Sequence, residues 1–188
     1  IALDSIIPGE FCGKKIWFFS FSMDIVKLQI QKKRKELLFL FSKVYSGGLR
    51  GIDGYVVQVE ADVSDGLPGF YMVGSLASEV REAEERVRTA MRNVGFHLSA
   101  RKITVNLSPA NVRKEGTACD LPVAIAVLAA YGIVMPSGLK QTGFLGELGL
   151  DGKIKPVRGV LSMVLAMAEK GLERCFLPEE NVAEGMAA

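Results

Sequence analysis

Apolar and polar side chains alternate most regularly in residues 55–63. The odd positions are apolar, whereas Gln58, Glu60 and Asp62 fall between them. Because successive side chains of a strand point to opposite faces, this pattern predicts a half-buried strand with one face in water. Shorter apolar segments predict further strands at residues 43–45, 70–73, 103–107, 142–145, 152–156 and 174–177. Turns are predicted between them at Gly47-Gly48 and at residues 65–69 and 149–152.

Helical spacing of apolar residues marks three further segments, residues 80–94, 121–131 and 160–169. A glycine follows each segment and is expected to end the helix. We predict Asp120 as the N-cap of the second helix, since a carboxylate there accepts from free amides. On the first helix, Glu82 with Arg86 and Glu84 with Arg88 are four residues apart, which indicates a solvated, charged face.

Composition narrows the possible classes. Hydrophobic residues make up 49% of the 188 residues, which is enough for one globular core. The net charge of +2 is too small to indicate nucleic-acid binding. Cys12, Cys119 and Cys175 are far apart and His97 is the single histidine, so we expect no metal site and a reduced, cytoplasmic protein. We interpret His97 as a packing residue or a partner of a helix C-terminus. The longest apolar run, residues 121–131, is too short to cross a membrane.

Residues 114–122 read KEGTACDLP and resemble the segment that holds the serine of Lon-type Ser-Lys peptidases. In that pattern Ala118 takes the place of the serine. A second segment, residues 151–161, resembles the one that supplies the lysine, and Leu161 takes its place. A methyl group and an aliphatic chain can neither attack a carbonyl nor accept a proton. We therefore expect a Lon-like fold without the peptidase chemistry, with Ala118 and Leu161 close together.

Cys119 directly follows the vacant serine position and is the one alternative nucleophile. A peptidase that uses this thiol would need a neighbour that lowers the pKa of Cys119. The sequence identifies no such neighbour, so a buried structural thiol is the preferred interpretation.

Several ordered motifs extend the resemblance beyond Lon. They lie at residues 41–46, 49–54, 66–70, 103–110, 113–116 and 120–122. Together they resemble the N-terminal domain of the magnesium-chelatase-related AAA+ family, typified by ComM and YifB, over residues 41–185. The resemblance implies an α+β fold of the type seen in domain 2 of ribosomal protein S5, with a mixed β-sheet and about three helices packed on it.

The same resemblance implies a bacterial, ring-forming DNA motor, hexameric in its best-understood members, that drives branch migration during DNA uptake and recombination. Its partners would be its own AAA+ module and sister subunits, possibly DNA, and no membrane. This chain has no G-x-x-x-x-G-K-[ST] phosphate loop. We therefore expect no cofactor in the chain itself, and expect ATP and Mg²⁺ to bind an AAA+ module beyond Ala188.

Basic residues near the predicted loops are candidates for contacts with DNA phosphates. The candidates are Arg113, Lys114, Arg101, Lys102, Lys153, Lys155 and Arg158. Two alternatives remain open: all are ordinary surface charges, or Arg113 and Lys114 brace the loop that contains them. An RNA-binding domain is disfavoured, because the chain lacks basic clusters interleaved with aromatic residues.

Residues 1–40 fall outside the family pattern. We expect them to be an atypical extension that is poorly ordered or is not translated in the cell, with Leu40 as the start. The alternative is a genuine extension that begins at Met23 and carries the basic residues 32–35.

Overall fold

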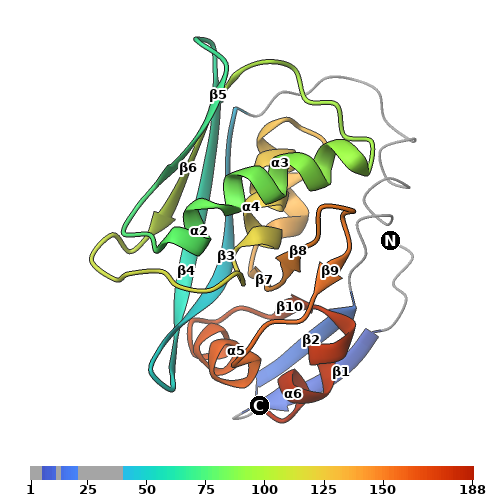
Figure 1. Cartoon of the computed structure of the whole chain (residues 1–188). Coiled ribbons are helices and arrows are strands. Elements are labelled where there is room, and N and C mark those ends of the chain that lie inside the picture. Colours follow the sequence, from blue (N-terminus) through green and yellow to red (C-terminus); the bar gives the residue numbers. More distant parts are fainter. Residues whose placement is uncertain (1–5, 12–13, 21–39) are drawn as a thin grey trace.

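The structure is a computed structural model that describes residues 6–11, 14–20 and 40–188 (Figure 1). The described chain forms an eight-stranded sheet in the order β1-β2-β10-β7-β3-β4-β6-β5, and β8 and β9 form a separate hairpin. The sheet is mixed: β3, β4 and β6 are antiparallel neighbours, whereas β5 lies parallel to β6 and β10 parallel to β7. The strands are β1 (Ile6–Phe11), β2 (Lys14–Ser20), β3 (Phe41–Arg50), β4 (Asp53–Ser64), β5 (Gly69–Val73), β6 (Lys102–Ser108), β7 (Thr142–Phe144), β8 (Glu147–Leu148), β9 (Ile154–Lys155) and β10 (Arg174–Leu177).

Three helices of ten or eleven residues pack on this sheet. They are α3 (Ala83–Asn93), α4 (Asp120–Ala130) and α5 (Val160–Glu169). Two short helices, α2 (Ser78–Arg81) and α6 (Val182–Met186), and two 3-10 turns, Pro136–Leu139 and Glu179–Asn181, complete the described elements. The predicted α+β class, with a mixed sheet and about three helices, is confirmed. The arrangement is consistent with a domain like domain 2 of ribosomal protein S5 and like the Lon proteolytic domain.

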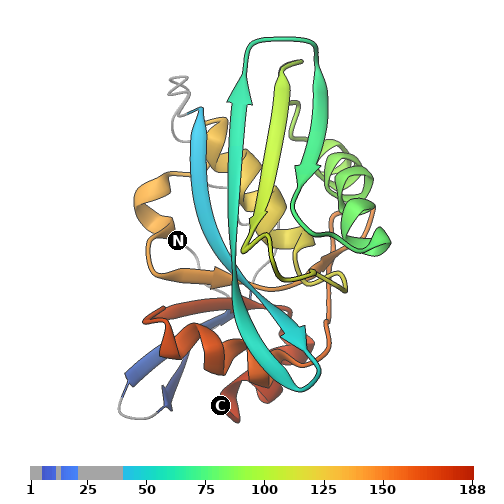
Figure 2. The same cartoon turned by 90° about the vertical axis from the view of Figure 1, so that its left-hand side faces the viewer.

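Helices α4 and α5 cover opposite faces of the long β3–β4 ribbon that runs through Figure 2. Val44 and Val59 belong to the core cluster that includes the side chains of α3 and α4. Leu49 and Val56 pack against the cluster built around α5. Every residue of α4 is buried, which explains why its sequence is apolar on all sides.

The glycine pair Gly47-Gly48 lies inside β3, so the prediction of a turn there is wrong. A β-carbon on Gly47 would lie 2.6 Å from Cβ of Met163 on α5, and one on Gly48 would lie 2.5 Å from Cζ of Tyr55. The two glycines therefore permit close packing rather than a change of direction. The chain turns instead at Gly51, whose φ is +65°.

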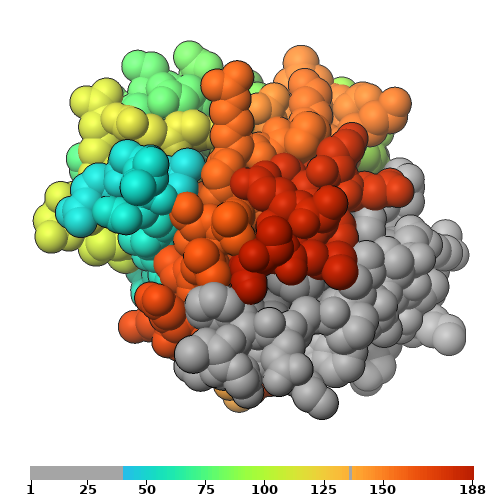
Figure 3. All heavy atoms as spheres, turned by 90° about the horizontal axis from the view of Figure 1, so that it is seen from below, coloured from blue at the N-terminus to red at the C-terminus, as the bar shows by residue number. Residues whose placement is uncertain are grey.

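The first predicted helix is divided at Glu82, which ends α2 and precedes α3. The third helix and the last strand match their predicted bounds at Val160–Glu169 and Arg174–Leu177. Seen from below, the orange-to-red chain that follows residue 150 occupies the middle of the surface, and the cyan β3–β4 turn projects beside it (Figure 3).

Strands β1 and β2 extend the sheet beyond β10. β2 lies parallel to β10, and β1 lies antiparallel to β2. The prediction that residues 1–40 are poorly ordered or untranslated stays a prediction, and Cys12 and Met23 lie outside the described residues. Within the described ranges, no helix is both long and apolar enough to cross a membrane.

Candidate functional site

The loop between β6 and α4 carries the peptidase-like motif and is held from several sides. The Lys114 amide donates to the Ser75 carbonyl at 2.8 Å, and the Ala77 amide donates to the Lys114 carbonyl at 3.0 Å. The Tyr55 hydroxyl donates to the carbonyl of Arg113 at 3.2 Å. These bonds fix the loop against β4 and the segment that leads into α2.

Lys114 is buried, with 1% of the residue exposed. Its ammonium donates to the carbonyls of Pro109 and Val112, the latter at 2.8 Å. Burial lowers the pKa of Lys114, and the nearby Cys119 acts in the opposite direction. This arrangement does not favour contact between Lys114 and DNA, because the ammonium is already bonded to the loop carbonyls, and the contact stays a prediction. The position of Lys114 matches the alternative that the sequence left open, a lysine that braces its own loop.

Ala118 is also buried and belongs to the same apolar cluster as Val160 and Met163 of α5. Leu161, which follows Val160 in α5, is half-buried. Its amide donates to the Glu184 carboxylate at 3.2 Å. The two vacant dyad positions thus lie next to or within apolar packing around α5. Direct contact between the Ala118 and Leu161 side chains stays a prediction.

Cys119 has 5% of its surface exposed, and its thiol donates to the Ser46 hydroxyl at 3.8 Å. Burial raises the pKa of Cys119 to about 11. A nucleophilic cysteine needs the reverse, a thiolate that forms near neutral pH. The geometry therefore favours the buried structural thiol over the alternative nucleophile.

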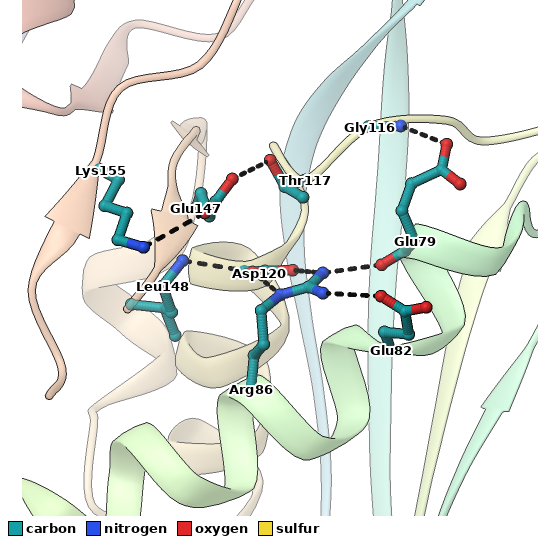
Figure 4. Close-up of polar contacts among 9 residues, drawn as sticks. All are labelled: Glu79, Glu82, Arg86, Gly116, Thr117, Asp120, Glu147, Leu148 and Lys155. Atoms are coloured by element: carbon teal, nitrogen blue, oxygen red, sulfur yellow. Dashed lines mark hydrogen bonds and ion pairs between the residues drawn. The ribbon is translucent and has the colours of Figure 1, made fainter. Parts of the chain in front are cut away.

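Asp120 forms a buried ion pair that the sequence had not indicated (Figure 4). The Arg86 guanidinium donates to the two Asp120 oxygens, from Nε at 2.7 Å and from Nη2 at 3.0 Å. The Leu148 amide donates to the same carboxylate at 3.2 Å. Burial raises the pKa of Asp120, and the Arg86 guanidinium opposes this rise. The N-cap prediction for Asp120 is wrong: Asp120 is the first residue of α4, and its side chain makes no capping bond.

Around this pair, further polar contacts join several parts of the chain (Figure 4). Arg86 also donates to the Glu79 carbonyl at 2.7 Å, and the Glu79 carboxylate accepts from the Gly116 amide at 3.2 Å. Thr117 donates to Glu147 at 2.6 Å. The network thereby ties α2 and α3 to the loop, to the start of α4 and to the β8–β9 hairpin.

The other DNA-contact candidates come from three segments of the chain. Arg101 and Lys102 lie at the start of β6, where Arg101 pairs with Asp65 at 3.0 Å. Arg113 lies on the loop and pairs with Glu115 at 3.5 Å. The last group lies on or beside the β8–β9 hairpin. Lys153 pairs with Asp151 at 3.7 Å, and Lys155 pairs with Glu147 at 3.6 Å. Arg158, the third member of this group, is exposed. Contact of these residues with DNA stays a prediction.

Metal-binding side chains are not grouped in the described part of the chain. No set of three or more His, Cys, Asp or Glu residues there is arranged to hold an ion. His97 is exposed, which argues against a packing role, and its interpretation as a partner of a helix C-terminus stays a prediction.

Comparisons with known proteins agree with the motif pattern. The family model described as "Subunit ChlI of Mg-chelatase" matches residues 59–181. Competence protein ComM of Haemophilus influenzae is 42% identical over 141 residues, and YifB of Escherichia coli is 40% identical over 143 residues. These alignments cover 75% and 76% of this chain and 28% of each relative, so the chain spans about 28% of their length. Lon protease of Mycolicibacterium smegmatis is 28% identical over 140 residues, which is 70% of this chain and 17% of the protease. The chain therefore belongs to the magnesium-chelatase-related family that subunit ChlI represents and that includes ComM and YifB.

Proposed function

We propose that this chain is a non-catalytic N-terminal domain of a magnesium-chelatase-like AAA+ ATPase that acts as a ring-forming DNA motor. The observation that carries the proposal is the vacant dyad: Ala118 lies in an apolar cluster, and an aliphatic side chain stands at position 161. The relatedness to ComM, whose name marks it as a competence protein, supports a role in DNA uptake and recombination.

In this proposal ATP and Mg²⁺ bind the AAA+ module of the complete protein. The chain itself contains no G-x-x-x-x-G-K-[ST] loop, and such a loop supplies the amides and the lysine that hold the phosphates. The domain would contact its own AAA+ module and sister subunits, in a hexamer, in the cytoplasm.

The Arg86–Asp120 network suits a domain of this kind. It fixes the loop, α4 and the hairpin relative to one another through partly buried, charge-assisted bonds. A rigid body can transmit the movement of an attached motor to DNA or to a neighbouring subunit without deforming. Peptide hydrolysis would require a nucleophile and a base, and neither stands in its place here.

The experiment compares the complete protein with this chain alone. The complete protein should hydrolyse ATP faster when DNA is present and should move a four-way junction. Both activities should disappear when the lysine of its phosphate loop is replaced. The 188-residue chain should neither hydrolyse ATP nor cleave an unfolded protein such as casein. A complete protein without DNA-stimulated hydrolysis would contradict the motor.

The alternative function, a Lon-like peptidase that uses Cys119, makes an opposite prediction for the chain alone. Peptide turnover that disappears in Cys119→Ala, together with one-to-one labelling of Cys119 by a thiol-directed peptidase probe, would establish it. The raised pKa of Cys119 and its burial argue against that outcome.

A further inference from the structure

A groove of about 540 Å³ lies between α3 and the segment that returns from α3 to β6, with the start of β5 at its side. In Figure 1 this returning segment passes from the end of α3 over the upper part of the molecule. Phe70, Met91 and Phe96 line the groove, and all three are nearly fully buried. Cationic side chains line its more exposed parts, namely those of Arg88, Arg92 and Arg101, with His97 beside them.

The cations of the groove come from two elements. Arg88 and Arg92 are four residues apart on α3, which places them on one face, about 6 Å apart along the axis. Arg101 comes from the end of the returning segment. All three are arginines, whose planar guanidinium offers paired donors to a phosphate group. Among the described residues that line the groove, Glu85 is the one carboxylate.

The ion pairs of the groove arginines are partly or largely exposed. Arg88 pairs with Glu85 at 3.4 Å, not with Glu84 as the sequence suggested, and the two side chains are 55% and 72% exposed. Arg101 pairs with Asp65, and the two side chains are 29% and 94% exposed. Arg92 is exposed and has no ion-pair partner in the described ranges. Ion pairs of this kind contribute little to stability, so the phosphates of an anionic ligand can take the place of the carboxylates.

We propose that this groove holds a single strand of DNA by its phosphates. The proposal rests on the proposed function and adds the site, of which only Arg101 was among the sequence-derived candidates. A phosphate chain needs cations along its path and no deep apolar pocket, which is what the groove offers. An acidic protein partner would need a desolvated pocket for an anchor side chain. Phe70 and Phe96, each 6% exposed, fill the floor of the groove and leave no such pocket there. Because these rings are not free to stack with bases, binding should depend weakly on sequence.

The test measures the affinity of the 188-residue chain for a labelled oligothymidylate of about 20 nucleotides by fluorescence anisotropy, over a range of salt concentrations. The groove variant is Arg88→Gln/Arg92→Gln/Arg101→Gln. The matched control, Arg50→Gln/Lys140→Gln/Lys170→Gln, removes the same charge from exposed positions outside the groove. Circular dichroism and thermal unfolding check that both variants are folded.

The groove variant should bind at least about tenfold more weakly at low salt. The slope of log K against log salt should become shallower by about 2, because each lost phosphate contact on a single strand contributes about 0.7. The control should keep the wild-type slope. An equal loss in the control would show that only net charge matters and would overturn the proposal.

Three further outcomes would also overturn it. The first is loss of binding in Lys153→Gln/Arg158→Gln with full binding in the groove variant. This result would place the DNA-binding site near the β8–β9 hairpin and would be compatible with the motor function. The second is displacement of the oligonucleotide by polyglutamate at equal charge concentration, which indicates an acidic protein as the ligand. The third is no binding by the wild-type chain, and the DNA-stimulated ATPase of the complete protein then decides separately whether the motor function also fails.

Discussion

Replacing Arg86 by methionine would leave the Asp120 carboxylate buried without its cation. Asp120 is 1% exposed and accepts three hydrogen bonds, two from Arg86 and one from the Leu148 amide. Removal of one partner of a buried ion pair costs about 3 to 5 kcal/mol, since the remaining charge is neither solvated nor paired. We expect the free energy of unfolding of Arg86→Met to fall by that amount.

The same helix supplies a matched control. Arg88 pairs with Glu85 at 3.4 Å, and both side chains are largely exposed. Exposed pairs contribute about 0 to 1 kcal/mol. Arg88→Met therefore removes the same guanidinium from the same helix and should lower the free energy of unfolding by less than about 1 kcal/mol.

A second variant keeps the test informative if Arg86→Met does not fold. Arg86→Met/Asp120→Asn removes both charges and retains an amide oxygen that can accept from the Leu148 amide. Its free energy of unfolding should lie between those of the wild type and Arg86→Met, with a coupling of about 2 to 3 kcal/mol between the two positions. Urea unfolding followed by far-ultraviolet circular dichroism gives all values. Equal urea midpoints for Arg86→Met and Arg88→Met would refute the argument that this pair is buried and structural.

Further predictions concern the close packing, the thiol and the vacant dyad. Gly47→Ala should lower the free energy of unfolding by about 1 to 3 kcal/mol in urea melts, because its methyl group would overlap Met163. Raising the pH from 9 to 11 should lower the free energy of unfolding by up to roughly 1.4 kcal/mol per pH unit for Cys119. Burial raises its pKa from 9.0 to about 11, so the unfolded thiol loses its proton first, and Cys119→Ala should flatten this part of the profile. Ala118→Ser/Leu161→Lys should show no casein turnover, since a dyad without positioned oxyanion donors is a poor catalyst, and turnover that requires both substitutions would contradict this.

The elements that the sequence predicted well are those whose pattern is local. Helix α5 matches its predicted bounds because its apolar stripe is followed by a glycine. Strand β10 matches its predicted bounds because it is a short, isolated apolar run. The pair Gly47-Gly48 was misinterpreted for the opposite reason. Its glycines are required by Met163, which lies more than a hundred residues further along the chain, and nothing in the local sequence reports that contact.

The charged residues of the site were the hardest to predict. Most Arg, Lys and Asp side chains lie at the surface, so Arg86 was assigned to a solvated face and Lys114 to DNA. One signal could have corrected the first assignment. Asp120 heads a helix whose ten following residues are all apolar, and a carboxylate at the head of a buried helix needs a buried cation. The cation's identity depends on how α3 crosses α4, which no pattern in the sequence specifies.

The positions of Lys114 and Asp120 show which residues of the peptidase-like motif hold the loop in place. Lys114 satisfies the carbonyls of Pro109 and Val112 inside the loop, and Asp120 holds Arg86 at the start of α4. Either residue, if lost, would leave buried polar groups unpaired, and such groups cost about 1 to 3 kcal/mol each. Ala118 lies between them and makes no comparable polar contact, because its side chain is a methyl group in an apolar cluster. The motif thus combines residues that maintain the loop with a position, Ala118, whose side chain makes no polar contact, and the proposed non-catalytic function requires only the first kind.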